Sequence, residues 1–356
     1  MTQPATTRPT RTAAHTAKTL TFVVPAYNME DYLERCVLSL TAAARNDDIE
    51  VLIIDDGSKD GTLAAAQDFE RRYPGIVRAI HQENKGHGGA VNTGIANASG
   101  AYVKVVDADD WVGPESLEQV MAVLREETAK NEPIDMLVTN YVYDKVGKRR
   151  KHVVNFRHAM KPGATLTWND LGRFGLAEYI LMHALTYRTD IVRASGMRLP
   201  EHTFYVDFIY AYQPFPWVKT MRYLDTPFYH YFIGREGQSV QTDVMIRRVD
   251  QLIQVNRHMV EATPERGDVP EGLYRYMIHF LAIESSVASV FLILSRDPAN
   301  YAKKTKLWQD LKAHSAAIHR DVRRKPMSRA LNLPGSVGRF IIRWGYRIAE
   351  HVVGFN

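Results

Sequence analysis

Cysteine is almost absent from the sequence, and no apolar leader is evident. Cys36 is the only cysteine among 356 residues, so no internal disulfide can form. Residues 1–18 are rich in Thr, Ala and Arg and contain no apolar run of the signal-peptide kind, which predicts a flexible tail. These absences fit a reducing compartment, and we expect a cytoplasmic protein.

Excess charge and long uninterrupted apolar runs are also scarce. Hydrophobic residues make up 45% of the chain and charged residues 24%, with a net charge of +5. These values are typical of a folded globular protein. A long apolar stretch, Tyr274–Leu294, is interrupted by His279 and Glu284, so it predicts a buried core helix and not a membrane span.

Basic residues gather at the C-terminal end of the chain. Eight Lys and Arg residues lie between His319 and Arg347, against one acid, Asp321. The expected last helix, Ser336–Val353, has a basic face and an apolar face. The basic face carries Arg339, Arg343 and Arg347. The apolar face carries Ile341, Trp344, Ile348, Val352 and Phe355. Such a helix can lie on an anionic membrane, here the inner face of the cell membrane, or dock on preceding helices with its arginines in water. We expect no nucleic-acid partner.

Strands and helices alternate through the first third of the chain. The expected strands are Leu20–Pro25, Val51–Ile54, Ile76–His81 and a fourth from Tyr102, and the expected helices are Asp31–Arg45, Gly61–Arg72 and one ending at Ala98. Continuous apolar strands alternating with helices indicate a parallel sheet covered on both faces. Because ligands of such sheets bind outside the carboxyl ends of the strands, the loops at those ends should converge on one crevice.

Three carboxylates follow the fourth strand. The strand is rich in β-branched residues, and burying unpaired carboxylates is costly, so Asp107, Asp109 and Asp110 must lie where it emerges. Oxygen ligands crowded this closely suit Mg²⁺ or Mn²⁺, which share their remaining positions with substrate phosphates. The alternative is that Asp109 or Asp110 only caps the helix that begins near Pro114.

A glycine-rich loop, Gly86–Val91, lies between the third strand and its helix. It lacks the third glycine of the dinucleotide fingerprint and belongs to the third unit instead of the first, so no dinucleotide site is predicted. Gly88 still permits close approach of the backbone to a ligand, with a helix N-terminus favouring negative charge. An ordinary turn before a helix is the alternative.

An antiparallel extension is expected beyond the parallel half. Ile134–Tyr143 alternates as a strand does and can pair with Lys151–Phe156. Further along, the pattern predicts a helix over Leu171–Ala194 and two strands, Trp217–Tyr223 and Pro227–Ile233. Asp207 stands among aromatic residues and Val206, surroundings that raise the pKa of a carboxyl group and suit it to accept protons. The alternative is a helix cap for residues 208–212.

The four loops together resemble those of the inverting family-two glycosyltransferases, which have the GT-A nucleotide-diphospho-sugar transferase fold. The matching segments are Pro25–Asn28 with Glu30, Asp55–Ser58 with Asp60 and Gly61, Asn84–Gly86 with Ala90 and Asn92, and Asp107–Asp110. The resemblance implies an α/β fold with a Rossmann-like, mostly parallel sheet, helices on both faces and a helical C-terminal region. It places the GT-A domain at residues 19–242, with a nucleotide-binding half (19–115) and an acceptor half (116–242), and the helical region, a candidate for membrane association, at 243–356.

The resemblance also implies residue roles. Asp109 would be the direct metal ligand, Asp107 would lie near the metal or ribose, and Asp207 would be the general base. The other implied substrate contacts are Pro25, Tyr27, Glu30, Asp55, Asp56, Lys85, Gly88, Asp110 and Arg235. The implied cofactor is Mg²⁺ or Mn²⁺. His230 is either a further metal ligand or an ordinary strand histidine.

The expected activity is metal-dependent, inverting transfer of a sugar from a nucleotide-diphosphate donor, with a UDP-sugar favoured. The acceptor would be a saccharide or lipid-linked molecule in the synthesis of a cell-surface polysaccharide or glycan. Val206 stands where the family usually has Glu, and this departure motivates an alternative, a nucleotide-sugar-binding module that has lost transfer. A nucleotidyltransferase built on the same carboxylates is a further alternative.

Overall fold

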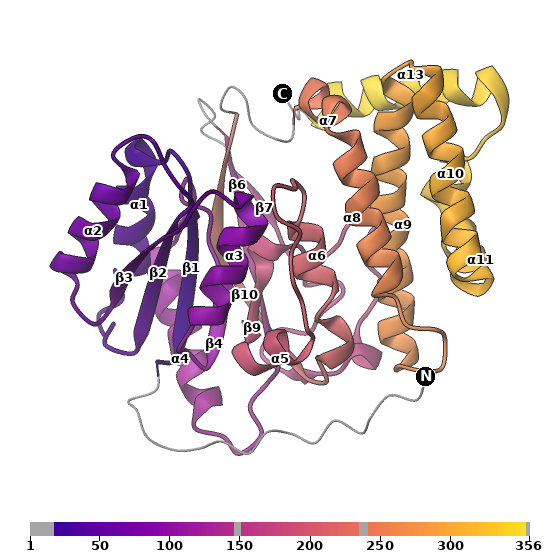
Figure 1. Cartoon of the computed structure of the whole chain (residues 1–356). Coiled ribbons are helices and arrows are strands. Elements are labelled where there is room, and N and C mark those ends of the chain that lie inside the picture. The colour runs from indigo at the N-terminus through magenta and orange to yellow at the C-terminus, as the bar shows by residue number, and fades with distance from the viewer. Residues whose placement is uncertain (1–17, 146–150, 235–240, 354–356) are drawn as a thin grey trace.

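The computed structural model describes residues 18–145, 151–234 and 241–353, with side chains of the last helix described through Arg347 (Figure 1). A sheet and its covering helices occupy one side of the molecule. Long helices from the C-terminal third stand beside them.

The N-terminal half forms the parallel part of the sheet. Its strands, in the spatial order β3-β2-β1-β4, are β1 (Leu20–Ala26), β2 (Ile49–Asp55), β3 (Val77–His81) and β4 (Tyr102–Val105), and the helices between them are α1 (Glu30–Leu40), α2 (Thr62–Arg72) and α3 (Gly86–Asn97). Every residue of β1 and β2 is buried, which explains their continuous apolar sequences. Helix α3 packs closely on β1, because a Cβ atom on Gly94 would lie 2.1 Å from Cγ1 of Val23.

Mixed pairing extends the sheet beyond β4. Strand β9 (Leu185–Arg188) is antiparallel to both β4 and β6 (Met136–Lys145), and β10 (Met221–Ile233) is parallel to β6. Three short strands complete it, namely β5 (Trp111–Val112), β7 (His152–Val154) and β8 (Thr165–Leu166). The helical elements of this half are α4 (Pro114–Thr128), η1 (Trp168–Asp170), η2 (Met182–Ala184), α5 (Thr189–Ala194), α6 (Asp207–Tyr212) and η3 (Phe215–Trp217). The predicted pairing of the segment after Lys151 with the strand before it is confirmed.

Two sequence-based predictions in this half are wrong. Leu171–Ala194 is not one helix, because β9 inside it is held between β4 and β6, and sheet pairing overrides the helical pattern. The two strands predicted over residues 217–233 are one strand, β10, whose register against β6 shifts between Leu224 and Tyr229. Pro227 lies at that shift, where a residue without an N–H costs the ladder least.

The C-terminal third is helical, with α9 at its centre. The helices are α7 (Thr242–Arg247), α8 (Val249–Glu261), α9 (Glu271–Leu294), α10 (Pro298–His314), α11 (Ala316–Arg324), α12 (Pro326–Leu331) and α13 (Gly335–Val353). In the described chain α9 alone is long and apolar enough to cross a membrane, but 78% of its most apolar window is buried inside the protein. Tyr276 and Phe280 of α9 pack on Phe215, so the apolar core runs continuously from the sheet into these helices.

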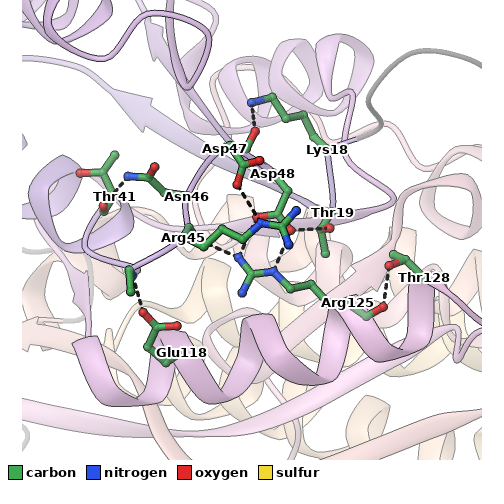
Figure 2. Close-up of polar contacts among 11 residues, drawn as sticks. Lys18, Thr19, Thr41, Arg45, Asn46, Asp47, Asp48, Glu118, Arg125 and Thr128 are labelled. Carbon is green, nitrogen blue, oxygen red and sulfur yellow. Dashed lines mark hydrogen bonds and ion pairs between the residues drawn. The ribbon is translucent and has the colours of Figure 1, made fainter.

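A polar cluster fastens α4 to the edge of the sheet opposite the carboxyl ends of β1 and β2. Figure 2 shows Arg125 facing Asp48, with Nη2–Oδ1 and Nε–Oδ2 distances of 2.7 and 2.8 Å. Thr19 donates a third hydrogen bond to Asp48. Burial acts to raise the pKa of Asp48, but the bonds from Arg125 and Thr19 outweigh it and lower the pKa. Helix α4 is therefore fastened at the amino ends of the strands, and the loops at their carboxyl ends take no part in this attachment.

Candidate active site

Hydrogen bonds join the loops that follow β1 and β2. The Oδ1 atom of Asn28 accepts a hydrogen bond of 2.9 Å from the backbone N–H of Lys59, and Oε2 of Glu30 accepts one of 2.8 Å from Gly61. The Glu30 carboxylate also fills the space that a Cβ atom on Gly61 would need. The predicted substrate residue Glu30 therefore braces these two loops in the structure.

Asp55 is the last residue of β2 and Asp56 follows it, and both are buried. The Oδ2 atom of Asp55 lies 2.6 Å from Nδ1 of His81 at the end of β3. Oδ1 of Asp56 accepts hydrogen bonds from Gln82 (2.7 Å) and from the backbone N–H of Lys85 (2.8 Å). The two acids thus hold the second and third loops together, and the predicted contact of Asp56 with a nucleobase stays a prediction.

Asp107, Asp110 and His183 form a compact cluster beyond the end of β4. One ligand atom from each lies within 4.8 Å of the others. Asp107 is half-buried, whereas Asp110 and His183 are buried. His183 belongs to η2, 76 positions after Asp107, and it reaches the acids because β9, which follows η2, pairs with β4. This is the candidate metal site of the protein.

Asp110 is the most constrained carboxyl group of the cluster. Its Oδ1 accepts a hydrogen bond of 2.7 Å from the backbone N–H of Phe232, and its Oδ2 accepts one from the hydroxyl of Tyr229. Burial and the nearby charge of Asp107 raise its pKa well above the ordinary value. Asp109, the metal ligand implied by the resemblance, is half-buried and lies outside the three-residue cluster. Its proposed role as a ligand stays a prediction.

A buried lysine positions His183. The Nζ atom of Lys104 in β4 donates hydrogen bonds to the backbone carbonyls of His183 (2.8 Å) and Leu185 (3.1 Å). The His183 ring stacks on Tyr231 with a centroid distance of 4.6 Å. Burial lowers its pKa to about 4, so the ring is neutral at pH 7, the form that binds metals. Its buried Nδ1 has no hydrogen-bond partner among the described residues.

His87 contacts the acid cluster and acts electrostatically on Asp207. It lies at the start of α3, and its Nε2 is 2.9 Å from Oδ1 of Asp107. Burial acts to lower the pKa of His87, but the hydrogen bond to Asp107 and the charges of Asp107 and Asp207 outweigh burial and raise it. Burial alone would raise the pKa of Asp107, and His87 reverses that effect and lowers it.

Asp207 is the first residue of α6 and is half-buried. The alternative predicted from the sequence, that Asp207 caps the helix, is met only in part. The N-cap residue is Val206, which makes no side-chain cap bond, and Asp207 is the first residue after it. Burial raises the pKa of Asp207 to about 6, although the charge of His87 opposes the shift. A carboxyl group with this pKa is ionised at pH 7 and is a stronger base than an ordinary aspartate.

The remaining predicted residues have different environments. Pro25 is buried in β1, while the Tyr27 side chain is 42% exposed beyond it. Lys85 caps α3 and lines a cavity of about 470 Å³ between α3 and the segment after α5. Gly88 faces the chain itself, because a Cβ atom there would lie 2.4 Å from the carbonyl oxygen of Pro200. Arg235 lies outside the described residues.

His230 lies apart from the cluster, in β10. Its ring stacks on Trp111 at a centroid distance of 5.3 Å, and its Nδ1 is 3.5 Å from Oδ2 of Asp144. This arrangement fits an ordinary strand histidine, and a role for His230 as a further metal ligand stays a prediction.

The family model described as "Glycosyl transferase family 2" matches residues 21–178. This part of the chain is a family 2 glycosyl transferase domain. The match spans the four loops and Asp107–Asp110 and confirms the resemblance seen in the sequence.

Relatives and solved structures agree with the family 2 assignment. The putative glycosyltransferase EpsH of Bacillus subtilis is 27% identical over 233 residues, which cover 60% of this chain and 60% of EpsH. Staphylococcus aureus TarS 1–349 in complex with UDP-GlcNAc superposes with a TM-score of 0.64 at 18% identity, covering 92% of both chains. The mannosyltransferase PcManGT from Pyrobaculum calidifontis, in complex with GDP-Man and Mn²⁺, superposes with a TM-score of 0.52 at 16% identity, covering 94% of this chain and 90% of that one. These structures confirm the predicted GT-A fold.

Sequence reasoning named the acids of this candidate site but gave no role to His183 or His87. His183 had no recognisable signal, because the segment that contains it was expected to be a helix. His87 lies inside the glycine-rich loop, and the sequence analysis interpreted only the glycines of that loop. Lys104 stands in the apolar run of β4, and a lysine in a buried strand is the signal that could have identified it.

Proposed function

We propose that the protein is a metal-dependent inverting glycosyltransferase. It would move a sugar from a nucleotide-diphosphate donor, with UDP-sugars favoured, to a hydroxyl group of a saccharide or lipid-linked acceptor in cell-surface polysaccharide or glycan synthesis. The observation that carries the proposal is the compact cluster of Asp107, Asp110 and His183 beyond β4, together with His87, which lies 2.9 Å from Asp107 and acts electrostatically on Asp207. The donor class is supported by the UDP-GlcNAc and GDP-Man complexes of the structural neighbours.

The residues present fit a divalent cation. Asp107 and Asp110 offer carboxylate oxygens and His183 offers a neutral ring nitrogen, and these three atoms lie within 4.8 Å of one another. Of the two expected metals, Mn²⁺ suits this mixed set better, because Mg²⁺ strongly prefers oxygen ligands. When bound, the cation would supply positive charge that neutralises the departing nucleoside diphosphate.

Two neighbouring acids compete for the role of metal ligand. The sequence resemblance favours Asp109, whereas the geometry favours Asp110. Comparing Mn²⁺ affinity in Asp109→Asn and Asp110→Asn by calorimetry distinguishes them. We expect Asp110→Asn to keep one of its hydrogen-bond acceptors and hence its fold.

Asp207 would act as the general base. Its carboxylate takes the proton of the acceptor hydroxyl while the hydroxyl oxygen attacks the anomeric carbon of the sugar. The bond from that carbon to the diphosphate oxygen breaks, and its electron pair leaves with the nucleoside diphosphate. A single displacement of this kind inverts the anomeric carbon.

The donor would lie along the loops at the carboxyl ends of β1–β4. Pro25, Tyr27, Asp56 and Lys85 are proposed to contact the nucleoside, and the exposed ring of Tyr27 is available for stacking on a base. A cytoplasmic location remains part of the proposal.

Substituting Asp207 by Asn tests the proposed reaction. The variant should bind the donor normally but release nucleoside diphosphate about 10²–10⁴-fold more slowly, the usual loss for a general base. Asp68→Asn, on the exposed surface of α2, serves as the matched control. Wild-type protein that binds donors without ever releasing diphosphate would instead be a binding module, and release of pyrophosphate from a nucleoside triphosphate would indicate a nucleotidyltransferase.

A further inference from the structure

Helix α13 exposes an apolar stripe on the surface of the protein. Four large side chains at helical spacing i, i+3, i+4 and i+7 are exposed, namely Val337 (68%), Phe340 (61%), Ile341 (51%) and Trp344 (58%). They lie on one face of the helix because residues three and four apart are neighbours on a helical surface. We refer to these four residues as the α13 stripe.

The opposite face of α13 attaches the helix to the protein. Ile342 is buried with Ile293 of α9, and the ring of Tyr346 lies 5.9 Å from that of Phe291. The Arg343 guanidinium donates a hydrogen bond to the hydroxyl of Tyr301. The sequence-based alternative, an apolar face docked on the preceding helices with the arginines in water, is therefore wrong for Ile341, Trp344 and Arg343. The helix is held without using the α13 stripe.

The charges on α13 and on the helix packed against it are positive. Residues 335–347 contain no acid, and Arg347 is exposed at the end of this segment. Helix α12, which packs against α13, adds the exposed Arg329.

The position of α13 relates it to the candidate active site. In Figure 1, α13 and α7 lie at the top of the molecule, the end toward which β6 and β10 run. Strand β4 points the same way, because β9 is antiparallel to both β4 and β6. The acid cluster beyond β4 and helix α13 therefore lie toward the same end of the protein.

We infer that the α13 stripe docks on an anionic lipid bilayer, with Phe340 and Trp344 entering the boundary between headgroups and acyl chains. An exposed apolar face flanked by arginines matches the composition of helices that lie in a membrane interface. A second copy of the chain fits less well, since pairing through a shared two-fold axis would bring like-charged arginine clusters together. If the protein is a glycosyltransferase, this docking would bring the active site to an acceptor in or near the bilayer. That consequence rests on the proposed function, whereas the docking itself does not.

Vesicle sedimentation tests the inference without a donor or an acceptor. The wild-type protein should sediment with vesicles of phosphatidylcholine and phosphatidylglycerol, and less with phosphatidylcholine alone, because the arginines need anionic lipid. Raising the salt concentration should weaken binding. The variants Phe340→Asp and Trp344→Asp should each bind at least about tenfold more weakly, since a carboxylate resists entry into the interface.

Leu176→Asp is the matched control, because Leu176 is 59% exposed in a loop far along the chain from α13. It should bind vesicles as the wild type does, and unchanged thermal unfolding of all three variants excludes misfolding. The inference is overturned if the wild type stays in the supernatant, or if both α13 variants sediment like the control. It is equally overturned if Phe340→Asp only dissociates an oligomer in light scattering while vesicle binding is absent.

Discussion

The Nε2 atom of His87 lies 2.9 Å from Oδ1 of Asp107, and this hydrogen bond joins the start of α3 to the acid cluster. Since His87 also acts electrostatically on Asp207, one imidazole influences both the candidate metal site and the candidate base. Residues that orient a metal ligand in this way usually affect affinity and rate together.

Replacing His87 by Ala should therefore lower diphosphate release by roughly 10–100-fold and weaken Mn²⁺ binding by a similar factor, because Asp107 loses the group that orients it. Steady-state kinetics and calorimetry with Mn²⁺ measure the two effects. His158→Ala removes a histidine–carboxylate pair of 2.8 Å, with Glu178, that plays no part in the proposed site, and it should change neither quantity. Full activity in His87→Ala would contradict a role for this bond.

The rate of transfer should fall as the pH drops through about 6. Asp207 must be ionised to accept a proton, and its pKa in the folded protein is about 6 instead of the ordinary 3.8. Below that pKa the carboxyl group is protonated, so kcat/KM should decrease by about tenfold per pH unit. In His87→Ala the inflection should move to higher pH, because the charge of His87 lowers the pKa of Asp207. A profile that stays flat down to pH 4 would exclude Asp207 as the base.

Substituting Gly88 by Ala should reduce stability by about 1–3 kcal/mol, because the added Cβ would overlap the carbonyl oxygen of Pro200. Gly345→Ala, in an exposed turn of α13 with no atom near the new methyl group, should be neutral or stabilising by up to about 1 kcal/mol. Urea unfolding measures both. If Gly88→Ala kept its stability and lost donor binding, the need for glycine at position 88 would come from close approach of the donor and not from packing against Pro200.

Glu284→Gln should stabilise the protein at alkaline pH relative to the wild type. Glu284 is buried in α9 beside Asn256, and burial raises its pKa to about 8 from the ordinary 4.5. The folded state keeps a proton that the unfolded chain releases, so the free energy of unfolding falls as the pH rises between those two values. The Gln side chain does not titrate in this range. The melting temperature of Glu284→Gln minus that of the wild type should therefore rise by a few degrees between about pH 5 and about pH 8. An unchanged difference between the two melting curves would show that Glu284 is ionised in the folded protein.

Much of the parallel half could be predicted from the sequence, because its strands are buried on both faces and read as continuous apolar runs. Val51–Ile54 lies within β2 as expected, and the loops at the strand ends meet through side chains such as Asn28 and Asp56. Helix boundaries were less accurate: α1 ends at Leu40 and not at Arg45.

The part of the sheet beyond β4 was harder to predict because its structure depends on long-range pairing. Leu185–Arg188 forms a strand only because β4 and β6 lie on either side of it. The same limitation hid His183, whose place beside Asp107 and Asp110 follows from the chain path of η2 and β9. Choosing between Asp109 and Asp110 as a ligand likewise requires the three-dimensional direction of the loop after β4.

The exposed face of α13 could not be chosen from sequence either. The pattern showed one apolar and one basic face, and ordinary docking would bury the apolar one. The structure instead uses Ile342 and Tyr346 as attachment points and leaves Phe340 and Trp344 outside.

The most direct test of the proposed function is diphosphate release from a panel of nucleotide sugars, with a saccharide acceptor mixture, in the presence of Mn²⁺ or of EDTA. We predict that at least one donor, most readily a UDP-sugar, yields nucleoside diphosphate with Mn²⁺ and that EDTA abolishes the release. Equal release in EDTA would contradict the assignment of Asp107, Asp110 and His183 as a metal site required for transfer.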